Sequence, residues 1–238
     1  MSMSQKSEII SKILSPALRL WLRSQVDSVE DLQFQISGRN RHILSGYIPN
    51  VSLNSTRAVY QGLHLSRVRL EGENIRINIA QVLKGKPLQL LEPVKVTGEI
   101  HLEEADLNAS LSSSLLSNAF TDLLSMLLEL SGQPQPTTIL EKYRLSWHKV
   151  ILNADKLVLH GTIVDALGNE QPATIRAGLE LVNHQILRLH PIEINVLPKL
   201  FPISLTQLQV DLGDDVELEI VNLETGKLFC CGRLIVRS

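Results

Sequence analysis

Residues 103–131 read EEADLNASLSSSLLSNAFTDLLSMLLELS, and this stretch decides the fold. Its apolar residues recur at helical spacing, which predicts one long amphipathic helix over 103–131 that ends before Gly132 and Pro134. The apolar stripe is wider than one packing contact requires, so other elements must cover most of the helix. The stripe consists of Leu107, Leu111, Leu115, Leu116, Phe120, Leu123, Leu124, Leu127, Leu128 and Leu130.

The segments on both sides of this helix have the two-residue period of strands with one buried face. Strands are predicted within 33–102 and again within 143–238. The connections are too short for helical crossovers, so the strands should pair antiparallel. We therefore predict an α+β fold, organised as a single domain over 1–238, in which a curved sheet covers the long helix.

A second amphipathic helix is predicted near the N-terminus, within residues 1–26. Its polar side carries Lys12, Arg19 and Arg23, and Trp21 lies near its end, as in helices that lie in a membrane interface. The same pattern is typical of a helix that packs on a protein core. The sequence leaves both interpretations open.

Composition indicates an ordinary globular chain: 44% of the 238 residues are hydrophobic and 20% are charged. The adjacent Cys230 and Cys231 exclude a disulfide scaffold. We see no secretory signal and no apolar run of the roughly 18 residues that span a bilayer. We therefore expect a cytoplasmic protein, or one that rests peripherally on the inner face of a membrane.

Charge is distributed unevenly along the chain. Residues 1–86 carry 12 Lys or Arg against 6 Asp or Glu, whereas residues 87–238 carry 11 against 19. A basic first third suits contact with anionic lipid headgroups. Charges scattered over solvated strand faces explain the same numbers.

Several blocks of the sequence resemble the LmeA-like phospholipid-binding family, a group of bacterial proteins that is common in cyanobacteria. They are YQGLHLS at 60–66, ENIRINI at 73–79, VLKGKP at 82–87 and EADLNASL at 104–111. The final GKL at 226–228 and GRLIVR at 232–237 are similar to the family's last hairpin. The resemblance is sharpest between about 60 and 116, and its motifs are structural.

The resemblance implies a fold related to tubular lipid-binding proteins, in which a highly twisted antiparallel sheet wraps a long helix and leaves an apolar groove for acyl chains. Envelope members of the family carry an export signal, which we do not find here. The implied function is non-enzymatic binding of a phospholipid or fatty acyl ligand at the cytoplasmic face of a membrane. The alternative is a protein-interaction scaffold with a fully packed interior and no lipid.

Candidate site residues follow from this interpretation. Trp21, Arg76, Lys84 and Lys86 are candidates for headgroup or membrane contact. The acyl chains would contact apolar residues of the strands and of the long helix, namely Ile77, Ile79, Ile100, Leu102, Leu116, Phe120, Leu124, Leu127 and Leu128.

No catalytic residues, metal ligands or cofactor are predicted. The 7 His residues include no pair at the spacing of a helical zinc site, and no nucleophile elbow or dinucleotide-binding turn is present. The acidic residues between Asp211 and Glu219 lack the pattern of a calcium loop. A pI of about 6.4 without a basic, aromatic-rich face disfavours nucleic-acid binding.

Overall fold

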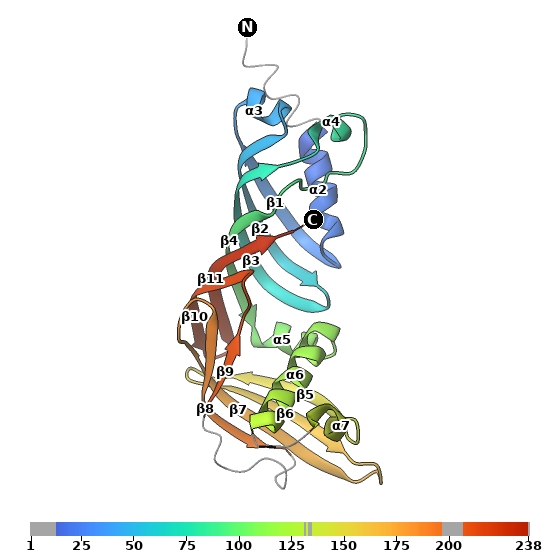
Figure 1. Ribbon diagram of the computed structural model, residues 1–238, viewed down its shortest axis with the longest axis vertical. Coiled ribbons are helices and arrows are strands. Elements are labelled where there is room, and N and C mark those ends of the chain that lie inside the picture. Colours follow the sequence, from blue (N-terminus) through green and yellow to red (C-terminus); the bar gives the residue numbers. More distant parts are fainter. Residues whose placement is uncertain (1–12, 131, 133–134, 197–206, 238) are drawn as a thin grey trace.

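The structure is a computed structural model that describes residues 13–130, 132, 135–196 and 207–237. It is elongated and contains two antiparallel sheets, one toward each end of the long axis (Figure 1). The α+β class and the antiparallel pairing are therefore confirmed.

The first sheet has six strands in the order β1-β2-β3-β4-β11-β10. Three short helices accompany it: α2 (Ser15–Ser24), α3 (Asn40–Leu44) and α4 (Ile79–Val82). Its strands are β1 (Ser28–Ser37), β2 (Tyr47–Tyr60), β3 (Leu63–Arg76), β4 (Val94–Glu103), β10 (Val216–Glu224) and β11 (Lys227–Val236).

The second sheet has five strands in sequential order and is formed by the chain between β4 and β10. The helices α5 (Glu104–Ser110), α6 (Ser114–Leu130) and α7 (Pro136–Leu140) precede it. Its strands are β5 (Arg144–Leu152), β6 (Leu157–Val164), β7 (Glu170–Leu181), β8 (Ile186–Asn195) and β9 (Leu208–Asp211). The chain thus leaves the six-stranded sheet after β4 and returns to it at β10.

Two hydrophobic cores stabilise the molecule. In the α2 core, Leu18 of α2 and Leu14, the residue just before the helix, pack on the six-stranded sheet. In the α6 core, Leu124, Leu127 and Leu128 pack on the five-stranded sheet. Prediction of a single domain over 1–238 is not tested by these contacts and stays a prediction.

The predicted continuous helix over 103–131 is instead two helices, α5 and α6. The interruption lies in the serine run after Ser110. The Ser113 hydroxyl accepts a hydrogen bond from the Leu116 amide at 3.2 Å, as an N-cap residue does, so α6 starts anew. The predicted arrangement of one sheet around one long helix is therefore not confirmed: the chain forms two sheets, with α2 on the six-stranded sheet and α6 mainly on the five-stranded sheet.

Helix α5 joins the two sheets through polar side chains. On one side, the Ser110 hydroxyl accepts a hydrogen bond from the His64 amide of β3 at 2.8 Å, and the Ser66 hydroxyl donates to Asp106. On the other side, the Asn108 amide bonds both the N–H and the C=O of Val150 in β5, each at 2.9 Å. Because β5 is an edge strand, α5 covers backbone groups that would otherwise be unpaired.

The described part of the N-terminal helix, α2, packs on the protein. Ala17, Trp21 and Leu22 lie against the α2 core beside the buried Leu14 and Leu18. The predicted part of this helix before residue 13 lies outside the described residues. None of the described helices is long and apolar enough to cross a bilayer.

Candidate functional site

The six-stranded sheet has one apolar face, which the two cores cover only at its ends. Phe34, Leu70 and Leu234 on this face pack in the α2 core. Leu102, Leu223 and Leu228 on the same face pack against the α6 core. Between them runs a row of cross-strand neighbours that belongs to neither core, here called the inner row: Leu32, Ser55, Val68, Ile100, Cys230 and Val221.

The inner row crosses all six strands, so it is about 24 Å long at the usual strand spacing of about 4.8 Å. Leu32, Ser55 and Val68 are buried, whereas Ile100, Cys230 and Val221 on the last three strands are half-buried. The apolar face is therefore most accessible where β4, β11 and β10 lie side by side. An aliphatic chain laid there would contact side chains of its own polarity.

The pKa of Cys230 reflects the burial of its side chain in this row. Burial, and secondarily the neighbouring Cys231 thiol, raise the pKa of Cys230 to about 11. The adjacent Cys231 lies opposite Glu99 and so points to the other face of β11. The two thiols therefore lie on opposite faces of β11.

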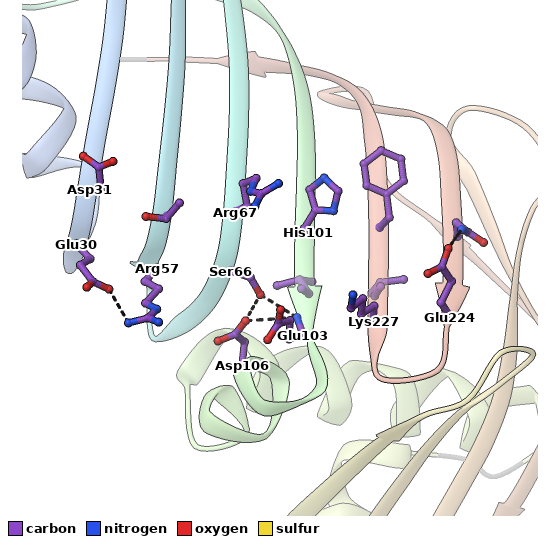
Figure 2. A pocket seen from close by; sticks show the side chains of 15 residues that line it. Glu30, Asp31, Arg57, Ser66, Arg67, His101, Glu103, Asp106, Glu224 and Lys227 are labelled. Atoms are coloured by element: carbon purple, nitrogen blue, oxygen red, sulfur yellow. Dashed lines mark hydrogen bonds and ion pairs between the residues drawn. The ribbon is translucent and has the colours of Figure 1, made fainter.

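The opposite face of the same strands is polar. An outer row on this face lies one residue along each strand from the inner row and lines a pocket of about 830 Å³. The outer row consists of Asp31, Thr56, Arg67, His101, Phe229 and Asn222. Figure 2 shows the Glu30–Arg57 ion pair, at 3.0 Å, at one end of this pocket and the bonds among Ser66, Glu103 and Asp106 below it.

The pocket carries three cations, Arg57, Arg67 and Lys227, and the five carboxylates of Glu30, Asp31, Glu103, Asp106 and Glu224. Such a lining would be costly to cover with an acyl chain, because the charged groups would lose water. His101 and Phe229, which also line the pocket, contact each other with ring centroids 4.7 Å apart. Across the described ranges, no group of three or more His, Cys, Asp or Glu side chains could hold a metal ion.

The structure distributes the predicted acyl-chain residues over three places. Ile77 and Ile79 are buried in the α2 core. Leu124, Leu127 and Leu128 are buried in the α6 core, and Leu102 and Phe120 pack against it. Ile100 lies in the inner row, and Leu116 is half-buried on α6. Of the predicted set, Ile100 alone belongs to the inner row, and Leu102 is the next residue along the same face of β4.

The predicted headgroup residues also separate. Lys84 and Lys86 are exposed in the loop after α4, and Arg76 lies over the Tyr47 ring at 5.2 Å. Trp21 is half-buried against the α2 core. The described α2 therefore packs on the protein, which is one of the two interpretations that the sequence left open.

The helical pattern of 103–131 does not reveal the roles of Asp106, Asn108 and Ser110, because their bonding partners lie in β3 and β5. A signal was present in Asn108, because asparagine is a poor residue for a helix interior unless its side chain has another bonding partner. The inner row was also missed, because its members come from six strands whose register the sequence does not display.

Comparisons with known proteins identify a family for this chain. Neither a curated protein nor a solved structure matches the chain. The family model described as LmeA-like phospholipid-binding matches residues 6–233, which is nearly the whole chain. The chain belongs to the LmeA-like phospholipid-binding family.

Proposed function

We propose that the protein binds a phospholipid, or another acyl-chain lipid, non-enzymatically along the inner row of the six-stranded sheet. The observation that carries this proposal is the half-buried set Ile100, Cys230 and Val221, which continues the apolar face between the two cores without belonging to either. Membership of a phospholipid-binding family supports the choice of ligand.

The energetics favour an acyl chain in this place. Each methylene removed from water contributes about 0.8 kcal/mol, so partial cover of about ten methylenes supplies several kcal/mol before ordering costs. The acyl chains of one leaflet span about 15 Å, half of the hydrocarbon core, and the row of about 24 Å is long enough for them. The polar groups of the lipid would remain toward solvent, because the inner row offers only the Ser55 hydroxyl as a polar partner.

Replacing Ile100 by Asp is expected to reduce lipid uptake by roughly tenfold or more, because a carboxylate on the inner row must lose its water when a chain covers it. Full-length protein is incubated with phospholipid vesicles and separated from them. The lipid that stays with the protein is then measured by mass spectrometry. Val221→Asp, on edge strand β10, makes the same test with less risk to folding.

His101→Asp is the matched control, because His101 neighbours Ile100 in β4 but faces the polar pocket. Thermal unfolding of each variant shows whether it is folded. Absence of lipid from the folded wild-type protein would favour the interaction scaffold with a packed interior. Equal loss from His101→Asp and Ile100→Asp would refute the inner row as the binding site.

A further inference from the structure

One end of the molecule combines exposed leucines with unpaired cations. This α3/α4 tip consists of residues 38–48 and 74–91, and it lies at the opposite end of the long axis from the five-stranded sheet (Figure 1). It contains α3, α4, the adjoining ends of β2 and β3, and the loop after α4.

The tip is built as a fixed structure. The Asn78 side chain, which is buried, donates to the Pro87 carbonyl at 3.0 Å and accepts from the Gln89 amide at 2.8 Å, so it holds the loop that follows α4. The Ile77 amide donates to the Gly46 carbonyl at 2.8 Å and ties α3 to α4. Gly46 has a φ of +80°, and a Cβ there would lie 2.5 Å from the Ile77 oxygen, so this approach requires glycine.

Neighbouring aliphatic residues alternate between the core and solvent in the tip. Ile43, Val82 and Leu90 are buried in the α2 core. Their chain neighbours Leu44, Leu83 and Leu91 are 46%, 45% and 60% exposed. The exposed three are not part of the core, so each leaves an apolar side chain on the surface of the tip, and exposed apolar side chains can mark a surface for interaction.

Charge identifies the partner of this surface. The tip carries five cations and no Asp or Glu, although the net charge of the whole chain is −2. Its cations are Arg39, Arg41, Arg76, Lys84 and Lys86. Among the described residues, Arg39, Arg41, Lys84 and Lys86 form no ion pair. A tip that carries both exposed leucines and unpaired cations is complementary to anionic headgroups above an apolar layer.

We infer that the α3/α4 tip docks on the surface of an anionic phospholipid bilayer, with Leu44, Leu83 and Leu91 entering the interface and the cations contacting lipid phosphates. This docking goes beyond the proposed lipid binding and does not depend on it. The inner row lies on a different part of the six-stranded sheet, so docking and uptake are separate properties of the molecule.

Vesicle flotation of the full-length protein tests the inference. The probes are vesicles of phosphatidylcholine alone and of phosphatidylcholine mixed with phosphatidylglycerol, at low and high salt. Wild-type protein is expected to float with the anionic vesicles and to be released by salt. Lys84→Glu with Lys86→Glu is expected to lower the partition coefficient by roughly tenfold or more. Leu83→Ser with Leu91→Ser should lower the partition coefficient on anionic vesicles at low salt.

Matched controls come from the five-stranded-sheet end of the molecule. Lys142→Glu with Lys149→Glu reverses two exposed cations, and Leu167→Ser removes an exposed leucine, and neither variant should weaken flotation. Ile100→Asp should float like the wild type, so that failure of uptake and failure of docking are distinguishable. Equal binding to both kinds of vesicle, no binding to anionic vesicles, or equal losses in controls and tip variants would overturn the inference.

Discussion

Replacing Asn108 by Ala is expected to lower the free energy of unfolding by about 2–4 kcal/mol. The Asn108 amide supplies both bonds to the buried Val150 backbone and a third, at 2.7 Å, to the Glu104 carbonyl. Alanine leaves the Val150 N–H and C=O without these partners, and each unsatisfied buried group costs about 1–3 kcal/mol. The change also weakens the connection between α5 and the five-stranded sheet.

Asn118→Ala provides the comparison. Asn118 is exposed on α6, and alanine is a better helix former, so its replacement should change stability by less than about 0.5 kcal/mol. Urea denaturation followed by far-UV circular dichroism measures both variants. If Asn108→Ala and Asn118→Ala unfold at the same urea concentration, α5 does not join the sheets in the way described.

Replacing Leu127 by Ala is expected to cost about 2–5 kcal/mol, because Leu127 is 0% exposed in the α6 core and its loss leaves a cavity. Leu130→Ala, on the same helix but 59% exposed, should cost less than about 1 kcal/mol. The two tryptophans allow the cores to be followed separately, since Trp21 packs against the α2 core and Trp147 against the α6 core.

The Leu127 experiment also separates core packing from lipid contact. A variant that remains folded at low temperature should retain lipid, because Leu127 lies away from the inner row. Loss of lipid without loss of stability would instead assign Leu127 to the binding site, as the sequence pattern predicts for Leu124, Leu127 and Leu128.

The sequence was sufficient for the fold class and for the strand-rich segments, because period-two and helical patterns are local properties. It was insufficient for the break at Ser113, where a cap outweighs the continuous leucine pattern. The division into two sheets also escaped prediction. It depends on β11 pairing with β4, whose residues are more than a hundred positions apart in the chain.

The candidate site was predictable only in part for the same reason. Strand alternation correctly places Ile100 and Leu102 on the apolar face of β4. It cannot tell that Ile77 and Ile79, in similar patterns, are covered by α2. The α3/α4 tip shows the same limit. In each pair of neighbouring aliphatic residues there, the local sequence does not tell which one is buried in the α2 core and which one is exposed.

The central claim, that acyl chains occupy the inner row, is tested most directly by the reactivity of the two cysteines. Cys231→Ser leaves Cys230 as the single thiol on the apolar face, and Cys230→Ser leaves Cys231 on the other face. Iodoacetamide labels each variant with and without saturating phospholipid. Because the pKa of Cys230 is raised to about 11, the reaction is run at alkaline pH, where the thiolate that reacts becomes more abundant.

Bound lipid is expected to slow alkylation of Cys230 by roughly tenfold and that of Cys231 by less than about twofold, since only covered thiolates lose access to the reagent. Equal rates at Cys230 with and without bound lipid would contradict the account.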